Sequence, residues 1–422
     1  MIARKMEVIY QIGIQLYGLL IHFAALWNAK AKAWVAGRKD WLQLQGKEAQ
    51  NASSPIWIHC SSLGEFEQGR PVIEGLKKTF PEQKILLTFY SPSGYTMRKH
   101  YRHADYIHYL PLDRKKNVAD FLQLWKPRMA IFVKYDLWLN FLSGLEERKI
   151  PTLVISAVFR RKDIYFRWYG SLFLKRLKSI DYFFVQDENS RSVLNEHDIE
   201  DNIKVVGDTR LDRVLQIVEK GKHIRELQSF CKDERTIIAG STWPEDEKML
   251  FAWINKYDTS EFDKLVIVPH EVSETHLRFI EKNAPRKTVR LSQYSSKDVG
   301  KVIMIVDQVG ILNKIYRYAR LAYIGGGFGA GIHNILEAAA YKKPVIFGPR
   351  HQKFKEAEDF LELEVARSVR NADEMQESVQ FLLRKQQRGW IDKQMEDYFR
   401  SSSGATKSIV EYIEDIFEEE RI

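Results

Sequence analysis

The stretch that decides the fold lies at residues 323–339 and reads YIGGGFGAGIHNILEAA. An apolar run ending at Ile324 predicts a buried strand, five glycines fall in the next seven positions, and a helix-forming stretch follows. So many glycines carry a large cost in backbone entropy, which a loop that brings its backbone against a ligand would explain. The N-terminus of the following helix would offer unpaired N–H groups and a positive dipole to a phosphate. Glu337, one turn into that helix, would reach ribose hydroxyls.

Outward from this stretch, short apolar runs alternate with segments of helical length. We predict strands at residues 56–60, 85–89, 106–110, 129–133, 152–156 and 182–185, and again at 236–239, 265–268, 302–305, 321–324 and 345–347. Strands separated by helices indicate parallel sheets covered on both faces. The sequence therefore predicts an α/β protein of two doubly wound, Rossmann-like domains that face a cleft, with ligands at the carboxyl ends of the strands.

The domain boundaries follow from changes of pattern along the 422 residues. We assign residues 1–45 to a membrane-associated N-terminal helix and linker, and 46–212 to a first domain. A charged, largely helical linker at 213–235 leads to a second domain at 236–422, which includes the C-terminal helices. The length of the chain exceeds that of one ordinary domain, which agrees with this division.

Charge is distributed unevenly along the chain. There are 65 Lys and Arg against 56 Asp and Glu, and residues 1–200 alone hold 30 basic and 20 acidic residues. A basic first half indicates an anionic partner, which leaves nucleic acid, an anionic membrane and a phosphorylated substrate open. The two cysteines, Cys60 and Cys231, are too few for a disulfide scaffold or a cysteine-built zinc site.

The N-terminal segment at residues 9–27 is mostly apolar. Its apolar residues fall at helical spacing on one face, namely Ile9, Ile12, Leu16, Leu19, Phe23 and Leu26. A narrower polar or small stripe is formed by Gln11, Gln15, Gly18 and His22. The segment has the length to span a bilayer, and its polar stripe suits an interfacial helix equally well. We expect membrane contact, and the alternative is a helix packed on the protein's own core.

Polar residues follow two predicted strands of the first half. Ser61, Ser62, Gly64 and Glu65 come directly after the strand at 56–60, where a helix begins. Glu65 either closes a capping box with Ser62 or acts as a general base that takes a proton from an attacking hydroxyl. Asp136 follows the strand at 129–133 and either orients a hydroxyl or caps a helix.

Similar positions occur in the second half. Ser241 and Thr242 follow the strand at 236–239, and small hydroxylated residues at a helix N-terminus can bind phosphate. Pro269 and His270 follow the strand at 265–268, where the histidine is either a phosphate donor or structural. The strand at 345–347 lacks the acid that a dinucleotide site requires, although Arg350 leaves an NADP-dependent oxidoreductase open.

Together these segments resemble the 3-deoxy-D-manno-octulosonic acid (Kdo) transferases of lipopolysaccharide assembly, which are glycosyltransferases of the GT-B fold. The resemblance runs from about residue 56 to about residue 361. The matching pieces are Ser62-Leu63-Gly64-Glu65, Asp136-Leu137-Trp138, Gly207-Asp208-Thr209-Arg210-Leu211-Asp212, Gly240-Ser241-Thr242, Gly325-Gly326-Gly327, His333-Asn334-Ile335-Leu336-Glu337 and Gly348-Pro349. The chain departs from the family pattern at Trp243 and His270, where the family has histidine and arginine.

The resemblance implies a CMP-Kdo donor, a lipid A precursor (lipid IVA) as acceptor, and inversion at the anomeric carbon without a metal or other cofactor. It implies the cytoplasmic face of a bacterial inner membrane, whose anionic surface would meet the basic half, and no nucleic acid. The catalytic residues would be Glu65 and Asp136, and the acceptor would bind at Ser61, Ser62 and Gly64. The donor would bind at Arg210, Ser241, Thr242, Pro269, His270, Gly310, Gly326, Gly327, His333, Asn334 and Glu337.

Three other readings stay open on the residues alone. One is another GT-B transferase, with a UDP-sugar donor and a lipid acceptor. The second is the NADP-dependent oxidoreductase. The third is a non-catalytic nucleotide- or nucleic-acid-binding protein, against which stands the absence of a recognised nucleic-acid motif in the sequence.

Overall fold

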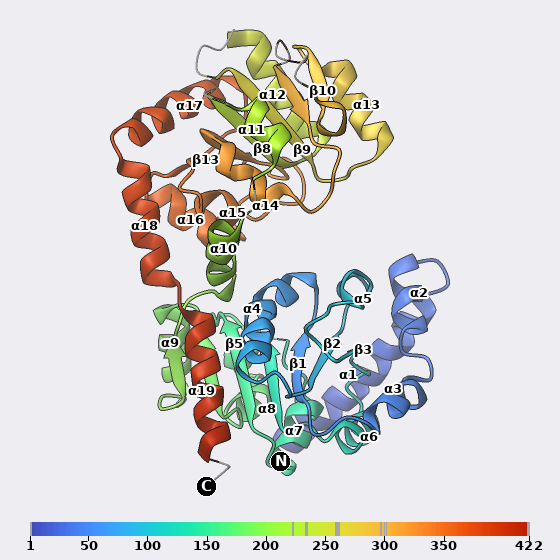
Figure 1. Ribbon diagram of the computed structural model, residues 1–422. Coiled ribbons are helices and arrows are strands. Elements are labelled where there is room, and N and C mark those ends of the chain that lie inside the picture. The colour runs from blue at the N-terminus through green and yellow to red at the C-terminus, as the bar shows by residue number, and fades with distance from the viewer. Residues whose placement is uncertain are drawn as a thin grey trace. The chain divides into compact units, whose positions relative to one another are not determined.

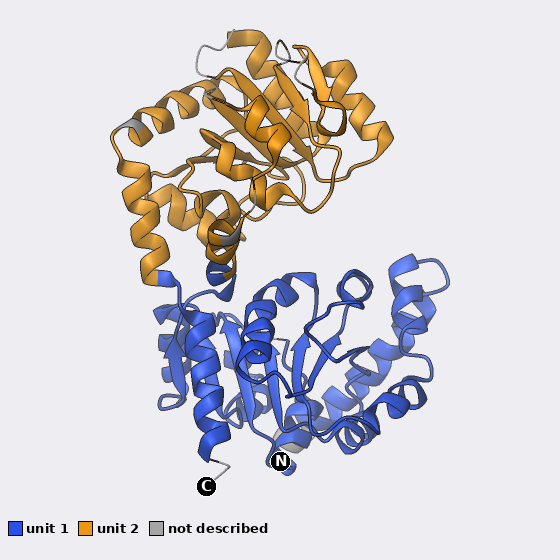
Figure 2. Cartoon of the chain, in the orientation of Figure 1, with its two compact units in different colours: residues 1–212, 402–422 blue, residues 213–401 orange. Residues whose placement is uncertain are grey.

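The structure is a computed structural model that describes residues 2–134, 136–221, 223–232, 235–257, 262–295, 298, 300 and 302–419. The chain divides into two compact units (Figure 2). Unit 1 comprises residues 1–212 and 402–422, and unit 2 comprises residues 213–401. Each unit is built around one parallel sheet with helices on both faces (Figure 1).

Within the described residues, the sheet of unit 1 has seven strands in the order β3-β2-β1-β4-β5-β6-β7. The strands are β1 (Ile56–Cys60), β2 (Ile85–Phe89), β3 (Tyr106–Tyr109), β4 (Met129–Val133), β5 (Thr152–Ala157), β6 (Tyr182–Val185) and β7 (Ile203–Val205). Strand β1 pairs in parallel with both β2 and β4, so the strand order reverses beside it. Ligands of doubly wound sheets bind at the carboxyl ends of the strands at such a switch point.

The helices of unit 1 are α1 (Ile2–Ala24), α2 (Ala29–Ala36), α3 (Trp41–Ala49), α4 (Leu63–Thr79), α5 (Pro92–Arg98), α6 (Lys115–Trp125), α7 (Leu139–Glu147), α8 (Ser171–Leu177), α9 (Glu188–Asn195) and α19 (Ala405–Glu419), with a 3₁₀ turn η1 at Ile164–Phe166. Alternate residues of β1 face opposite sides of the sheet. Trp57 packs against Phe121 of α6 and Phe141 of α7, whereas Ile58 belongs to the core that contains α4 and α19.

Helix α19 corrects the predicted domain boundaries, because it belongs to unit 1 and not to the second domain. Its apolar residues Ile409, Ile413 and Phe417 are buried in the core on the α4 side of the first sheet. Its N-terminus is held by Asp212, whose carboxylate accepts hydrogen bonds from the backbone N–H groups of Gly404 (2.6 Å) and Thr406 (2.7 Å). Residues 236–422 therefore do not form one domain, since the apolar face of α19 packs on the first sheet.

Within the described residues, the sheet of unit 2 also has seven strands, in the order β10-β11-β9-β8-β12-β13-β14. They are β8 (Thr236–Thr242), β9 (Lys264–Pro269), β10 (Thr288–Arg290), β11 (Ile303–Ile305), β12 (Leu321–Ile324), β13 (Val345–Phe347) and β14 (Ala366–Ser368). Strand β8 pairs with β9 on one side and β12 on the other, which makes the carboxyl ends of β8 and β12 the second switch point.

The helices of this part of the chain are α10 (Thr209–Lys220), α11 (Arg225–Phe230), α12 (Pro244–Tyr257), α13 (Glu274–Asn283), α14 (Leu312–Ile315), α15 (Leu336–Ala339), α16 (Lys355–Glu362), α17 (Ala372–Gln387) and α18 (Trp390–Ser402), with 3₁₀ turns η2 (Leu291–Gln293) and η3 (Tyr316–Tyr318). Helices α10 and α18 each include the residues where the chain changes from one unit to the other. The described residues of the predicted linker at 213–235 belong to unit 2, where α11 buries Leu227 and Phe230.

Helix α1 packs on unit 1 through its polar side. The hydroxyl of Tyr10 donates to Asp113 (2.7 Å), Gln11 donates to Asn140 (2.6 Å), and Ile14 is buried. The predicted apolar face points away, and its six residues are between 53% and 76% exposed, namely Ile9, Ile12, Leu16, Leu19, Phe23 and Leu26.

The apolar stretch near the N-terminus is divided between α1 and α2. None of the described helices alone is long and apolar enough to cross a bilayer. The pair Met6–Ala24 and Ala29–Ala36, bent by 119°, reaches that length and composition together.

Candidate active site

The first candidate site lies where β1 ends and α4 begins. Ser62 caps α4 by accepting a hydrogen bond from the backbone N–H of Gly64 (3.2 Å), and its hydroxyl donates to the carboxylate of Glu65. Glu65 is half-buried in the first turn of α4, where the helix dipole favours a negative charge. The local sequence thus provides the cap and, through the same serine, fixes the orientation of the carboxylate.

Asp136 lies at the neighbouring strand end, after β4. Its carboxylate accepts from Nε2 of His59 (3.2 Å) and from the indole N–H of Trp138 (3.2 Å), with a further hydrogen bond from Ser61. Burial by itself raises the pKa of a carboxyl group, but here the His59, Ser61 and Trp138 donors outweigh it and lower the pKa of Asp136. Asp136 is therefore a charged acceptor, while Trp138 and not Asp136 occupies the N-cap position of α7.

His59 was missed in the sequence because it lies inside an otherwise apolar strand. Its ring is 1% exposed, and Nδ1 contacts the hydroxyl of Thr88 on β2 (2.9 Å), which also accepts the indole N–H of Trp57 (2.8 Å). Because Thr88 accepts from Trp57, its own proton is available to Nδ1 of His59, which leaves Nε2–H to donate to Asp136. A buried polar chain across β1 and β2 thus fixes the imidazole behind Asp136.

The second candidate site contains the glycine-rich loop after β12, in which close packing of the backbone requires glycine. A Cβ on Gly325 would lie 2.2 Å from the carbonyl oxygen of Ser241, and one on Gly327 would lie 2.6 Å from the backbone of Gly348. Gly326 has a φ of +91°, which side chains disfavour. The first three glycines are therefore required by the close packing of this loop against the ends of β8 and β13.

Several N–H groups of this loop already have partners. The backbone N–H of Gly325 donates to Gly240 (2.8 Å), that of Gly326 to Asp246 (2.8 Å), and those of Gly329 (2.9 Å) and Gly331 (3.2 Å) to the carbonyl of Gly326. We expected the backbone of this loop to lie against a ligand, whereas these four N–H groups hold the loop's own shape.

Asp246 fixes the loop and was not predicted from the sequence. This side chain in the first turn of α12 is 1% exposed and accepts from the hydroxyl of Tyr323 (2.8 Å) and from the backbone N–H groups of Gly326 (2.8 Å) and Trp243 (2.9 Å). Burial raises the pKa of Asp246 despite these donors. The available signal was the run of three acids at residues 245–247, which directly follows Pro244 at the start of the helix.

Thr242 and Glu247 form a second buried contact at the end of β8. The hydroxyl of Thr242 donates to the carboxylate of Glu247 (2.8 Å), which also contacts Nε2 of His276 (3.0 Å). Both Thr242 and Glu247 are fully buried. Ser241, by contrast, is only partly buried and has a φ of +54°, so the strand end turns sharply at this residue.

Three aromatic rings are stacked where β8, β9 and the glycine-rich loop end. His270 lies between Trp243 (ring centroids 4.8 Å apart) and His333 (4.2 Å), and the indole N–H of Trp243 donates to Nε2 of His333 (3.2 Å). Burial, together with the charge of His270, lowers the pKa of His333 to about 4. His333 is therefore neutral, and the ring stack lies next to Pro269, the last residue of β9.

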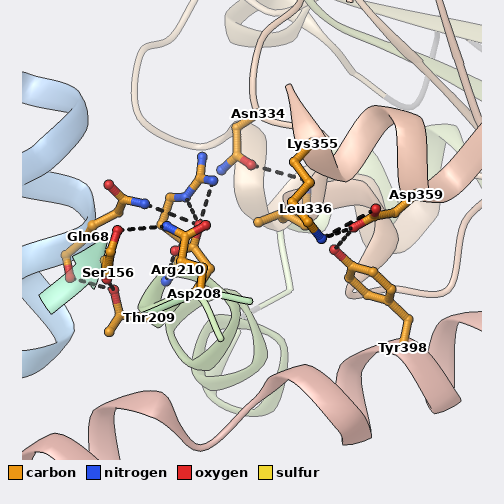
Figure 3. Close-up of polar contacts among 11 residues, drawn as sticks. Gln68, Ser156, Asp208, Thr209, Arg210, Asn334, Leu336, Lys355, Asp359 and Tyr398 are labelled. Carbon is orange, nitrogen blue, oxygen red and sulfur yellow. Dashed lines mark hydrogen bonds and ion pairs between the residues drawn. The ribbon is translucent and has the colours of Figure 1, made fainter. Parts of the chain in front are cut away.

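Asn334 and Glu337 lie together at the start of α15. The side chain of Asn334 accepts from the backbone N–H of Leu336 (3.1 Å) and donates to Glu337 (3.3 Å). Helix α15 contains only four residues, so Glu337 lies in its first turn and not one turn further on as expected. Figure 3 shows Asn334 beside Leu336.

Arg210 and Gly310 are the remaining predicted donor residues. Arg210 lies in unit 1 and binds Asp208 through Nε (2.9 Å) and Nη2 (2.6 Å) (Figure 3). Burial opposes the charge of Asp208, but Arg210 and the side chain of Gln68 keep the pKa of Asp208 low. Gly310 is exposed, with a φ of +79°.

The sequence of the chain is similar to those of known proteins. A family model described as 3-deoxy-D-manno-octulosonic-acid transferase matches residues 37–213. The chain is 30% identical over 334 residues to the 3-deoxy-D-manno-octulosonic acid transferase of Aquifex aeolicus, covering 77% of this chain and 85% of that protein. It is 28% identical over 346 residues to the enzyme of the same name from Rickettsia felis, covering 80% and 73%.

A solved structure gives the fold independently. The putative UDP-N-acetylglucosamine 2-epimerase from Listeria monocytogenes superimposes with a TM-score of 0.58 at 15% identity, covering 87% of this chain and 98% of that one. The two parallel-sheet domains and the named relatives define a glycosyltransferase of the GT-B fold. The chain belongs to the 3-deoxy-D-manno-octulosonic acid transferase family. The oxidoreductase and the non-catalytic readings are thereby set aside.

Proposed function

We propose that the protein transfers Kdo from CMP-Kdo to a phosphorylated lipid A precursor, lipid IVA, in lipopolysaccharide assembly, with inversion and without a metal. Membership of the Kdo transferase family supports Kdo transfer. The observation that carries the chemistry is the position of Glu65, a carboxylate oriented by Ser62 at the switch point of the first sheet. Asp136, fixed by His59 at the adjacent strand end, adds a second acceptor.

In this proposal Glu65 takes the proton from the acceptor hydroxyl. The hydroxyl oxygen forms a bond to the anomeric carbon of Kdo on the face opposite the leaving group, which inverts the configuration. The bond from that carbon to the phosphate oxygen breaks, and CMP departs with the electron pair. Asp136 orients the acceptor hydroxyl, because its lowered pKa keeps it a charged hydrogen-bond acceptor.

The donor is assigned to unit 2. Asn334 and Glu337 present adjacent polar groups suited to a ribose, while Ser241 and His270 stand at two adjacent strand ends of the second switch point. Charge that develops on the leaving phosphate would be stabilised there by preorganised donors. We expect Pro269, Gly326 and Gly327 to line this donor site, as predicted from the sequence.

Attachment to the cytoplasmic face of the inner membrane is part of the proposal. The exposed face of α1 supports it, because it gathers large apolar side chains, including Leu19, Phe23 and Leu26, on one side of a helix. Cytoplasmic leaflets carry anionic lipids, to which a basic first half is attracted. An acceptor held in the membrane would then be presented to unit 1.

The test is transfer of Kdo to lipid IVA, with CMP-Kdo generated in situ, by wild type, Glu65→Gln and Glu67→Gln. Glu67 lies two residues further along α4 and pairs with Arg98 (2.9 Å), which makes it a matched control. We expect Glu65→Gln to lower kcat about a thousandfold, since a general base contributes effects of this order. Glu67→Gln should keep its rate, and EDTA should leave the wild-type rate unchanged.

Three outcomes would contradict the proposal at different points. Full activity of Glu65→Gln would remove the base. Loss of activity in EDTA that Mg²⁺ restores would contradict metal-free transfer. No product from a folded wild type would contradict the donor and acceptor, and UDP-sugars with lipid acceptors would then be screened.

A further inference from the structure

Unit 1 contains a cavity that is lined by none of the residues assigned to catalysis, donor binding or acceptor binding. It has a volume of about 440 Å³ and is bounded by the end of α1, by α2 and by the start of α6. The basic side chains that line it are His22, Arg38, Lys39 and Arg114. Its lining includes no aspartate or glutamate, so the charge of these residues is not balanced within the cavity wall. We call it the α1–α2 cavity.

Arg38 is the most firmly held of these residues. Its guanidinium donates to the backbone carbonyls of Leu110 (2.8 Å), Tyr90 (2.8 Å) and Trp34 (3.3 Å) and lies 4.0 Å from the ring centre of Trp34. Burial lowers its pKa to about 10. The carbonyls and rings stabilise the cation without cancelling its charge, because none of them carries a formal negative charge. Arg38 thus provides a fixed positive wall.

The side chain of Arg114 reaches the cavity by lying against α1 at Gly18, where the helix has no side chain. A Cβ on Gly18 would lie 2.9 Å from Nη2 of Arg114 and 2.8 Å from Leu112. The guanidinium therefore occupies the space that a side chain at this position would take. Lys39 is exposed at the rim, so the cavity has one fixed and two adaptable cations.

The cavity adjoins the exposed apolar face of α1. His22 lines the cavity, and Leu19, 64% exposed, is its neighbour one helical turn earlier. Nδ1 of His22 donates to the carbonyl of Gly18 (2.7 Å), which fixes the ring at this boundary. A ligand that fits both surfaces must combine an anionic group with long apolar chains.

We propose that the α1–α2 cavity binds the phosphate of an anionic membrane phospholipid, whose acyl chains continue along the exposed face of α1. Cations and a phosphodiester form charge-assisted hydrogen bonds, and the apolar face removes the chains from water. The site selects lipids by headgroup charge, in addition to the general attachment of the helix. The inference does not rest on the proposed transfer reaction, because binding to vesicles is measured without donor or acceptor sugar.

The test is flotation of the full chain with phosphatidylcholine vesicles, with and without 20% phosphatidylglycerol. The double variant Lys39→Gln/Arg114→Gln is compared with Lys115→Gln/Lys116→Gln, which removes the same charge from neighbouring positions that do not line the cavity. We expect the first to lose about tenfold more affinity for phosphatidylglycerol vesicles than the second, which corresponds to one specific charged contact. On pure phosphatidylcholine all three proteins should float equally.

A second pair of variants leaves the charge unchanged. Gly18→Ala displaces Arg114, whereas Gly13→Ala on the same helix meets nothing within 4 Å. We expect Gly18→Ala to lower the preference for phosphatidylglycerol about threefold, on the order of half of one charged contact in free energy, and Gly13→Ala to leave it unchanged. Thermal unfolding establishes that each variant is folded.

The opposite results would overturn the proposal. Equal losses in the two double variants, with Gly18→Ala like wild type, would mean that surface charge alone attracts the membrane. Equilibrium dialysis against inorganic phosphate tests the other source of the same chemistry. Phosphate binding that Lys39→Gln/Arg114→Gln abolishes, with vesicle binding unaltered, would assign the cavity to a free anion.

Discussion

At the edge where β1 and β4 end, hydrogen bonds between side chains fix the first candidate site. At the edge where β8 and β12 end, close packing and hydrogen bonds of the backbone fix the second. Asp136 is 31% exposed and is oriented by His59 and Trp138, all through side-chain atoms. At the second edge Gly325 packs directly on the carbonyl of Ser241, and a buried carboxylate binds backbone N–H groups. We therefore expect substitutions at the first edge to lower transfer more than stability. Substitutions of the residues that hold the loop at the second edge should lower stability more than transfer.

The largest expected effect comes from exchanging an aspartate at each edge. Asp246→Ala leaves the donors of Tyr323, Gly326 and Trp243 without their acceptor, which costs about 4 kcal/mol in the free energy of unfolding. Asp136→Ala should cost about 1 kcal/mol, since its carboxylate is partly exposed, and should abolish transfer. Hydrogen exchange measured by mass spectrometry resolves the peptides of each unit. Unchanged protection of the unit 2 peptides in Asp246→Ala would refute the comparison.

The second prediction concerns the glycines. Gly325→Ala places a Cβ 2.2 Å from the backbone oxygen of Ser241, which cannot move aside, and should destabilise unit 2 by about 3 kcal/mol. Gly329→Ala meets its nearest atom at 3.6 Å and should be neutral or slightly stabilising. Urea unfolding of both variants distinguishes these outcomes, and similar midpoints would mean that the loop adapts.

The third prediction distinguishes the two edges by how the free energy of unfolding depends on pH. The pKa of His333 falls to about 4 in the folded protein, against about 6.5 unfolded, so the unfolded state binds more protons between these values. The free energy of unfolding should fall by about 1–2 kcal/mol as the pH drops from 6.5 to 4, after allowance for solvent screening. Asp136, whose folded pKa is lowered, loses its contribution only below about pH 4. Urea unfolding at pH 7 and 4.5 should show a smaller difference in His333→Gln than in wild type.

The smallest effect is expected from two helix caps at the first edge. Ser62→Ala and Ser91→Ala each remove the cap of one helix, α4 or α5, and should cost about 1 kcal/mol. Only Ser62 also holds Glu65, so only its variant should lower kcat. Both variants are measured by thermal unfolding and by transfer assays. Equal activities would mean that Ser62 acts only as a helix cap and does not orient Glu65.

Much of the sheet architecture could be predicted, because buried parallel strands are continuous apolar runs. The runs at 56–60 and 321–324 form β1 and β12 with the predicted bounds. The edge strands β7, β10 and β14 were missed, because each contains a charged residue and is only partly buried. The equally short β11 and β13 were predicted, because they are fully buried apolar runs. Helix α19 was placed in the wrong unit, because periodicity identifies an apolar face but not the sheet that covers it.

The positions of the candidate site residues were predictable where these residues follow a strand. Glu65 and Asp136 do so, and the structure places both at the first switch point. His59 lies inside a strand, and its partner Thr88 belongs to another, so pairing across the sheet was needed to identify it. The reason for the glycines was equally hidden, because Gly325 contacts Ser241, which lies far from it in the sequence.

The return of α19 to unit 1 has a consequence for protein synthesis. The ribosome releases residues 213–401 before α19, so unit 2 can complete its core while the first sheet still lacks one of its covering helices. Until then the apolar surface that receives Ile409, Ile413 and Phe417 is exposed on the nascent chain. Such surfaces bind chaperones or aggregate. The half of the chain that is translated first should therefore be the last to fold.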